Sequence, residues 1–396
     1  MEKNLKVEVV AVHGFPIQNL PLELLQLPVS LMTPAERLNL ASTSNKMENA
    51  LMKLRFPKVN LHSLHIHDGT NSGAKVADII ITSTNRADDS VLVVKCGTSS
   101  MYSERLVNVI TFPKWIDARF SAIANARAMY KVIRHLIPSD GLSLGLGPMK
   151  KTDMKRILSA EEFDNWTSAD VQGNHDMAAI GFIMNHAYKN RTLDCRANVQ
   201  FSTDFSHEKA FRFKGVRYTH APWVRLDHLI TMRGVEYIDL GHTNLSALEV
   251  NIFIRLCIDS EKPACNCITI GLTGGAPDEK DVLKGFIYIP ASVKVEKNMF
   301  FACSNSVGNP NIAIITLDDQ TVSCHFNSNE KEILQPRITL NAMKQKAKVL
   351  KEMAALKLED VEQRQRLEKQ IEEIWDNCEK ALAEEDKAHD ALMKNP

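Results

Sequence analysis

The stretch from Pro222 to Leu272, PWVRLDHLITMRGVEYIDLGHTNLSALEVNIFIRLCIDSEKPACNCITIGL, decides the fold class of this chain. A short apolar helix at Leu226 to Met232 leads into a β-branched strand at Val235 to Leu240. A helical segment follows, and Cys265 to Leu272 then alternates as another strand. Strand, helix and strand within about 35 residues predict a parallel βαβ unit with a right-handed crossover.

The helix inside this unit has a clear start signal. Ser246 can cap it, and Glu249, three residues later, can reach back to the cap amide to complete a capping box. We expect the helix to bury Leu248, Ile252 and Leu256, which share one face. The spacing of the unit is near that of leucine-rich repeats but longer, and no strict repeat is visible.

The rest of the large domain mixes strands and helices. The β-branched runs Val59 to Ile66, Val76 to Thr82 and Ser90 to Lys95 predict strands, and apolar positions every three to four residues predict a helix that ends at Pro138. Further elements are expected as strands at Leu142–Leu146, Thr192–Phe201, Ala210–Tyr218, Ala291–Cys303 and Asn311–Phe326, and as a helix at Asp176–Tyr188. Ala210–Tyr218 is rich in Arg and Lys, which favours an edge or exposed position. The last two strands predict an antiparallel hairpin around the loop at 305–310. Together these segments predict an α/β fold.

The N-terminal stretch from 15 to 55, FPIQNLPLELLQLPVSLMTPAERLNLASTSNKMENALMKLR, predicts three short helices. The first begins near Leu20 and is disturbed at Pro28. The second begins at Thr33, with a proline at its first position and Glu36 completing a capping box. The third begins near Asn45. So short a segment cannot bury its own leucines, so the surplus faces either the rest of this chain or another protein.

These residues resemble an F-box. The resemblance rests on Leu20-Pro21, Glu23-Leu24-Leu25, the start Thr33-Pro34-Ala35-Glu36, and Leu38, Leu40 and Ser44. It implies docking onto the Skp-type adaptor of a cullin-based ubiquitin ligase. The adaptor-binding residues that it implies are Leu20, Pro21, Leu24, Leu25, Leu38, Leu40 and Met47. The pattern differs from the family at Pro28, where an aliphatic residue is usual, and at Met47, where many members have tryptophan.

The segment after the helices carries a second resemblance. The order of helix, strand, Asn244-Leu245-Ser246 turn, helix with Asn251-Ile252-Phe253, and apolar strand is similar to the F-box-associated domain, type 2, of the large nematode F-box family. In that family this domain follows an F-box, as it does here at 56–335. The resemblance implies a domain that captures the target protein, at residues that the sequence does not identify.

The C-terminal segment 336–396 differs in composition from the rest. Glycine is absent from it and charged residues are frequent, which predicts a long helix. The apolar residues Met343, Leu350, Ile371 and Trp375 follow the average spacing of about 3.5 residues that is typical of a coiled coil. Lys357, Arg364 and Glu368 fall at the same spacing and interrupt the apolar seam. Residues 359–390 carry 12 acidic against 5 basic residues, whereas 337–357 is mainly basic. Either homodimerisation through a coiled coil or a solvated tail fits this pattern.

Composition limits the classes of partner. The 396 residues include 48 basic and 48 acidic ones, so no overall field attracts nucleic acid or an anionic membrane. The leader at 1–14 has no signal-peptide core, and no run reaches the roughly 18 apolar residues of a membrane span. Eight cysteines without a CxxC pair favour a reducing compartment, the cytoplasm or nucleus.

Catalytic motifs do not stand out. His65 and His67 would share a strand face near His62, and Cys265 and Cys267 would share another, but neither pair has the further ligands of a metal site. The string GLTGGAPDEKD at 271–281 lacks the lysine and hydroxyl end of a phosphate loop. We therefore expect a non-enzymatic substrate receptor without cofactor or metal. The alternative is a non-catalytic scaffold or interaction protein that oligomerises through the C-terminal helix and whose F-box has decayed through Pro28, and an enzyme on the α/β domain is compatible with the fold.

Overall fold

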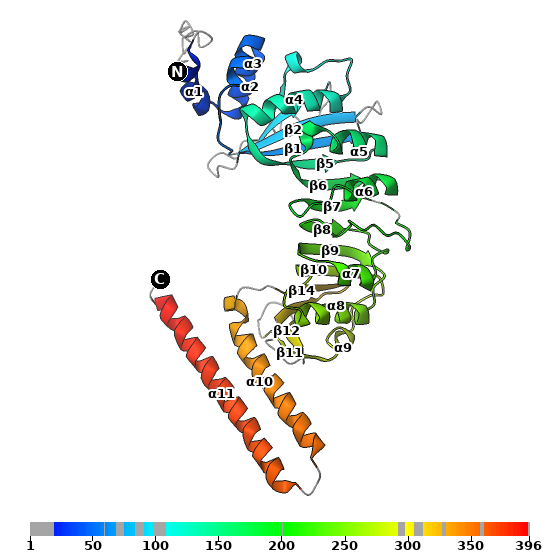
Figure 1. Cartoon of the computed structure of the whole chain (residues 1–396), viewed down its shortest axis with the longest axis vertical. Helices are drawn as coiled ribbons and strands as arrows, with labels where there is room; N and C mark the ends of the chain where they lie inside the picture. The colour runs from blue at the N-terminus through cyan, green and yellow to red at the C-terminus, as the bar shows by residue number, and fades with distance from the viewer. Residues whose placement is uncertain are drawn as a thin grey trace, which may run out of the picture. The chain divides into compact units, whose positions relative to one another are not determined.

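The computed structural model describes residues 20–58, 60–68, 75–83, 91–97, 108–197, 199, 201–291, 298–304, 312–326, 330–356 and 360–394. The expected leader at 1–14 and the hairpin loop at 305–310 lie outside these residues. The chain forms two compact units, Met1–Ser168 and Ala169–Pro396. Helices accompany a mixed sheet, so the fold class is α/β, as the sequence predicts (Figure 1).

Unit 1 begins with three helices, α1 (Leu22–Leu31), α2 (Pro34–Ser42) and α3 (Asn45–Leu51). The capping box of α2 is confirmed, because the Thr33 amide donates to Glu36 Oε2 at 2.8 Å and the Glu36 amide donates to Thr33 Oγ1 at 3.3 Å. Pro28 lies inside α1 and does not end it. A proline removes one backbone hydrogen bond, and the turns on either side preserve the helix.

The sheet of unit 1 has the order β5-β1-β2-β3-β4. Its strands are β1 (Asn60–Asp68), β2 (Lys75–Ser83), β3 (Val91–Lys95), β4 (Asn108–Thr111) and β5 (Ser139–Leu146). β1 pairs antiparallel with β2 and parallel with β5. The long helix α4 (Ala122–Leu136) packs on β2, and α5 (Lys151–Leu158) follows β5. The strands near 60, 76, 90 and 142 are thereby confirmed, whereas β4 and α5 were not predicted.

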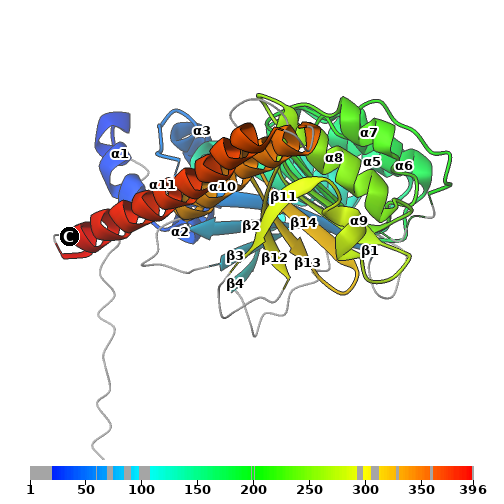
Figure 2. The same cartoon turned by 90° about the horizontal axis from the view of Figure 1, so that it is seen from below.

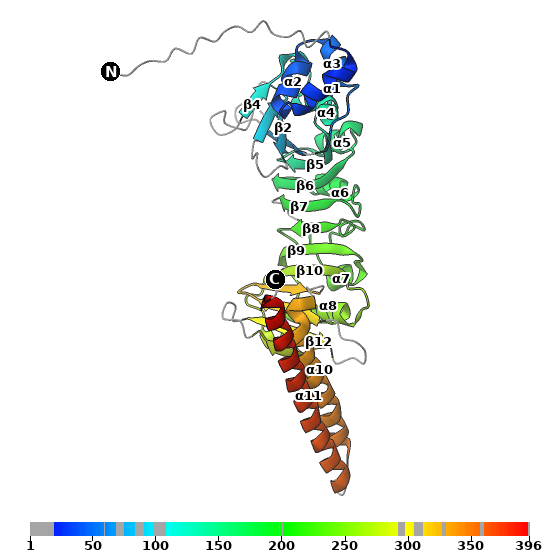
Figure 3. The same cartoon turned by 90° about the vertical axis from the view of Figure 1, so that its left-hand side faces the viewer.

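Unit 2 is built on parallel strands. The chain enters it within β6 (Trp166–Gly173), and the strands that follow are β7 (Thr192–Ala197), β8 (Gly215–Tyr218), β9 (Val235–Thr243) and β10 (Cys265–Leu272). β7, β8, β9 and β10 pair in parallel, which confirms the predicted βαβ arrangement. The connecting helices are α6 (Met177–Met184), α7 (Leu226–Thr231) and α8 (Ala247–Asp259), and they lie on one side of the strands (Figure 3). The Arg-rich stretch Ala210–Tyr218 was expected as an edge or exposed strand, but β8 covers only Gly215–Tyr218, lies between β7 and β9, and exposes Arg217 alone of its four residues.

The face that α8 buries differs from the expected one. Leu248, Ile252 and Leu256 are 49%, 39% and 45% exposed. The residues of α8 that pack inward are Val250, Asn251, Phe253, Ile254, Cys257 and Ile258. This helix carries two apolar stripes, and periodicity alone does not tell which one the sheet covers.

Unit 2 ends in antiparallel strands and a helical pair. The strands β11 (Phe286–Pro290), β12 (Met299–Ser304), β13 (Ile312–Leu317) and β14 (Thr321–His325) follow the short helix α9 (Glu279–Val282) and join the sheet beside β10. The stretch 311–326, expected as one strand, is two, because the chain turns where the Asp318 amide donates to the Thr321 carbonyl at 3.0 Å. The antiparallel pairing of β12 with β13 is confirmed.

The C-terminal segment is a helical hairpin rather than one long helix. α10 (Glu330–Ala355) and α11 (Val361–Lys394) run side by side (Figure 2). The expected boundary between the domain at 56–335 and the C-terminal segment at 336–396 falls inside α10, which contains Pro336, and Leu340 of the same helix is buried with Ile287, Cys303 and Ile312. The predicted tail is therefore packed on β11 to β13. In the described part of the chain, no helix combines the length and the apolar character of a membrane span.

Candidate functional site

An exposed leucine face lies on α1. Leu24, Leu27 and Leu31 are 60%, 67% and 78% exposed, and at about 100° per residue they fall within a sector of about 60° around the helix axis. Leu25 and Val29 of the same helix are buried. We call Leu24, Leu27 and Leu31 the α1 leucine face. Three large aliphatic side chains in one sector of a surface helix are typical of a protein-docking site.

A small hollow of about 200 Å³ lies between α1 and α3. Among the residues that the resemblance assigns to adaptor binding, Leu20, Leu25 and Met47 line it together. Leu25 and Met47 are themselves buried, whereas Leu20 is half-buried. The structure thus brings together three implied residues that lie up to 27 positions apart in the chain, from 20 to 47.

The other implied adaptor-binding residues lie in different surroundings. Pro21 is exposed at the start of α1, beside the α1 leucine face in sequence. Leu38 is buried inside unit 1, and Leu40 is half-buried on α2. Leu25, Leu38 and Met47 therefore shape this surface from within, while Pro21 and Leu24 are available to another protein.

Hydrogen bonds fix α1 against the helices that follow it. Gln26 Nε2 donates to the Arg55 carbonyl at 2.7 Å, and the Arg55 amide donates to Gln26 Oε1 at 3.3 Å. The guanidinium of Arg37 on α2 donates to the carbonyls of Val29 and Ser30 at 3.0 and 2.9 Å, which closes the C-terminal end of α1. These contacts keep the α1 leucine face in a fixed position without burying it.

The helical triplet also contacts the following part of unit 1. Lys114 Nζ lies 2.6 Å from Glu48 Oε2 and donates to the Ala41 carbonyl at 3.2 Å. The Trp115 indole donates to the same Glu48 oxygen at 3.2 Å. Arg37 Nη1 reaches the Leu136 carbonyl at the end of α4, at 3.4 Å. The three helices therefore belong to the same compact unit as the first sheet.

A ladder of alternating charge crosses the sheet of unit 2 on the face that does not carry the helices. Asp194, Arg217 and Asp239 are direct neighbours in register on β7, β8 and β9. Arg217 Nη1 lies 3.2 Å from Asp194 Oδ2, and Arg217 Nε lies 2.6 Å from Asp239 Oδ2. Arg196 extends the ladder by pairing with Asp170 on β6. We call these five residues the sheet ladder.

Burial and ion pairing have opposite effects on the pKa values of the charged groups in the sheet ladder. Burial raises the pKa of Asp194, against the effect of Arg217 and Arg196 beside it. The hydrogen bond to Asp239 raises the pKa of Arg217. Because each arginine has carboxylate partners on both sides, the ladder neutralises most of its own charge and leaves little for a ligand.

The histidines and cysteines that the sequence singles out lie on two separate strands. His65 and His67 share a strand face with ring centres 5.9 Å apart, while His62 is buried on the other face. Cys265 is buried and Cys267 half-buried. A hydrogen bond with Cys257, together with burial, raises the pKa of the Cys265 thiol, and burial raises the pKa of the Cys267 thiol. Within the described ranges, no group of three or more His, Cys, Asp or Glu side chains is arranged to hold a metal ion.

Two sets of surface residues were not assigned from the sequence. Leu27 and Leu31 have helical spacing with Leu24, a signal that was available once α1 extended past Pro28. The sheet ladder has a weaker signal, a charged residue at alternate positions of short strands such as TLDCRA. Its detection needs the register between strands, which the sequence does not supply.

Comparisons with known proteins add no relative. No protein-family model matches the chain, and neither the curated proteins nor the solved structures gave a significant match.

Proposed function

We propose that this chain is a non-catalytic substrate-recognition subunit of a Skp/cullin/F-box ubiquitin ligase. In this proposal the N-terminal helices bind the Skp-type adaptor, and through it a cullin, while the rest of the chain binds a target protein. The observation that carries the proposal is the α1 leucine face, because Leu24, Leu27 and Leu31 are exposed in a segment whose sequence resembles an F-box.

The energetics of that face support docking. Full burial of a leucine side chain contributes roughly 1.5–3 kcal/mol, so three leucines that are more than half exposed can contribute several kcal/mol to an interface. The hydrogen bonds from Gln26 and Arg37 hold α1 in place beforehand, so binding does not have to order the helix. The hollow between α1 and α3 supports a second contact, because apolar Leu20 lies at its edge and is only half-buried.

The cytoplasm or nucleus is the compartment of this proposal. All eight cysteines are free thiols, which supports a reducing environment.

The decisive experiment is a titration of the purified chain with a purified Skp-type adaptor in a calorimeter. We expect a complex of one chain with one adaptor, with a negative heat-capacity change from apolar burial. Addition of the cullin should then give a ternary complex in size-exclusion chromatography. Absence of binding at micromolar concentrations by a folded chain would exclude the ligase proposal.

A further inference from the structure

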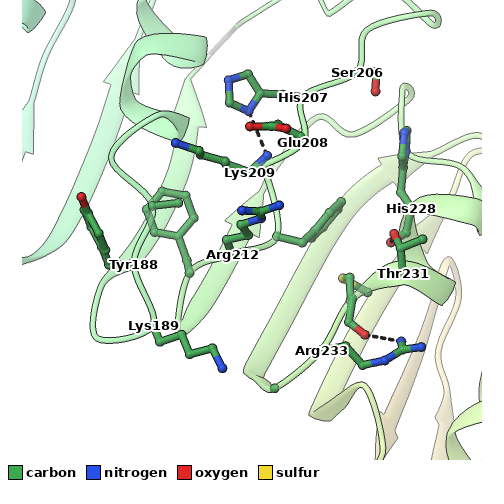
Figure 4. A pocket seen from close by; sticks show the side chains of 15 residues that line it. Tyr188, Lys189, Ser206, His207, Glu208, Lys209, Arg212, His228, Thr231 and Arg233 are labelled. Carbon is green, nitrogen blue, oxygen red and sulfur yellow. Dashed lines mark hydrogen bonds between the residues drawn. The ribbon is translucent and has the colours of Figure 1, made fainter.

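A cavity of about 670 Å³ opens in unit 2 near the N-terminal ends of β7, β8 and β9 (Figure 4). Three segments line it: 187–189 before β7, 206–213 before β8, and 228–234 at α7 and its exit. Its volume lies within the range of about 300–1,000 Å³ that is typical of ligand sites. The residues that line it differ from those of the sheet ladder, the α1 leucine face and the hollow beside α1.

The base of this cavity is apolar and held in place by aromatic packing. Phe211, which lines it, lies with its ring centre 5.8 Å from that of buried Trp223 and 6.1 Å from that of buried Tyr218. Tyr218 Oη donates to the Ala210 carbonyl at 2.8 Å, which fixes the segment that carries Phe211. The cavity is therefore formed in the free chain and needs no rearrangement to accept an apolar group.

The lining is cationic. It includes Lys189, Lys209, Arg212 and Arg233 against one carboxylate, Glu208. Among the residues that the structure describes, none of these four cations is within 4.0 Å of a carboxylate oxygen, in contrast to Arg196 and Arg217 of the sheet ladder. Like charges gathered at one hollow destabilise a fold, and they raise the local concentration of an anionic ligand. We call this site the cationic pocket.

One of the cations has a fixed orientation. Arg233 Nη1 donates to the carbonyls of Ile230 and Met232, both at 2.6 Å, at the exit of α7. This anchor uses the two hydrogens of Nη1, and a guanidinium has five N–H groups, so Nε and Nη2 remain to meet an oxyanion in a forked geometry. Arg212 lies between the other cationic side chains in the close view of the pocket (Figure 4).

We propose that the cationic pocket binds an oxyanion carried by a short peptide segment, with an apolar side chain of the segment against Phe211. The oxyanion is either the carboxylate of an acidic residue or a phosphoryl group on a modified residue, because both accept forked hydrogen bonds from arginine. A nucleic acid would need a continuous cationic track, and the sheet ladder beside these strands instead carries Asp170, Asp194 and Asp239.

This inference goes beyond the proposed function, because anion binding at the cationic pocket does not depend on the adaptor. The identification of the bound peptide as part of a ubiquitination target rests on the proposed function. Adaptor binding is measured separately by calorimetry, so failure of either proposal is recognised independently.

The test uses the full chain and three fluorescein-labelled peptides that share a leucine and differ only at the two residues beside it. These are Asp-Glu in the first, Asn-Gln in the second and phosphoserine-Gln in the third. We expect the acidic or the phosphorylated peptide to bind at least about tenfold more tightly than the amide peptide in fluorescence anisotropy, with affinity falling as salt rises. The comparison of the first and third peptides identifies the source of the oxyanion.

Matched variants assign the binding to the pocket. Arg212→Gln and Lys209→Gln each remove one cation and should weaken the preferred peptide about tenfold, whereas Glu208→Gln should strengthen it. Lys262→Gln removes an exposed cation outside the pocket and should leave the affinity unchanged. Circular dichroism confirms that each variant is folded. Equal binding of the three peptides, or parent-like binding by both Arg212→Gln and Lys209→Gln, would overturn the proposal.

Discussion

Arg37 Nε donates to the carbonyl oxygen of Val29 at 3.0 Å, so a buried guanidinium on α2 caps the end of α1. The same group reaches the Leu136 carbonyl at the end of α4 and lies 4.9 Å from the ring centre of Phe56. Burial lowers the pKa of Arg37, but an arginine keeps its charge at every physiological pH. Among the described residues no carboxylate pairs with Arg37. The partially negative C-terminal ends of α1 and α4 stabilise its charge instead.

Replacement of Arg37 by methionine should destabilise the chain. Methionine fills a similar volume but leaves the carbonyls of Ser30 and Leu136 without the guanidinium donor and the Val29 carbonyl with the Met32 amide as its remaining donor, at a cost of about 2–3 kcal/mol in the free energy of unfolding. Denaturant unfolding followed by circular dichroism measures the loss. Arg119→Met is the control, since Arg119 is exposed and its ion pair is with its near neighbour Asp117. An equal loss in the two variants would contradict the capping role.

The α1 leucine face should carry adaptor binding. Leu27→Ser with Leu31→Ser removes two exposed aliphatic side chains, and anchors at an interface centre cost about 2 kcal/mol or more, which is roughly a thirtyfold loss of affinity. Calorimetry with the adaptor measures it. Because both residues are exposed, thermal stability should stay unchanged.

The stripe on α8 provides the matched control for this double variant. Leu248→Ser with Ile252→Ser changes two aliphatic side chains that are 49% and 39% exposed on another helix, and adaptor affinity should equal that of the parent. If the α8 variant weakens binding as much as the α1 variant, the docking face is misassigned.

His62 should make stability depend on pH. Burial lowers its pKa from 6.5 to about 4, in a site where the ring meets Tyr130 edge-on and Nδ1 lies 3.1 Å from Ser139 Oγ. The unfolded chain therefore binds a proton near pH 6.5, whereas the folded chain binds it only near pH 4. Stability that is present above pH 6.5 is lost as the pH falls towards 4, by about 3 kcal/mol.

The variant His62→Gln cannot titrate and isolates this effect from the carboxylates. Between pH 7 and pH 4 the parent should lose about 3 kcal/mol more of its unfolding free energy than the variant does. His325→Gln alters an exposed histidine and should follow the parent at each pH. Parallel pH profiles of parent and His62→Gln would show that His62 does not titrate as described.

The helical hairpin should keep the chain monomeric. Val349 of α10 and Leu367 and Cys378 of α11 are buried within one chain, so the seam that the sequence left open to a dimer is already occupied. Lys346 Nζ of α10 lies 5.3 Å from the ring centre of Trp375 on α11, a cation–π contact that adds to the attraction between the two helices.

Sedimentation at micromolar concentration should therefore show a monomer. Leu367→Glu should open the hairpin and reduce the helical signal in circular dichroism, whereas Val361→Glu at an exposed position should not. A dimer of the parent chain would contradict this prediction and favour homodimerisation through a coiled coil.

Local signals in the sequence determined where several of the helices and strands begin. The capping boxes at Thr33 and Glu36 and at Ser246 and Glu249 form within four residues, so their partners are visible in the sequence, and both are present. Short β-branched runs such as Cys265 to Leu272 likewise fixed the strands of the α/β fold. These features depend on neighbours in the chain, and distant residues do not alter them.

Tertiary packing alone decided which apolar stripe is covered. In α8 the stripe of Leu248, Ile252 and Leu256 was expected inside and is exposed, while on α1 Leu31 joins Leu24 and Leu27 on the surface because Pro28 does not end the helix. The cationic pocket joins segments 187–189, 206–213 and 228–234, which meet only after the strands have paired in register. The burial of a side chain and the charge around it depend on residues that are distant in sequence. The sequence pattern therefore shows which apolar stripes exist, and only the fold shows which of them is covered.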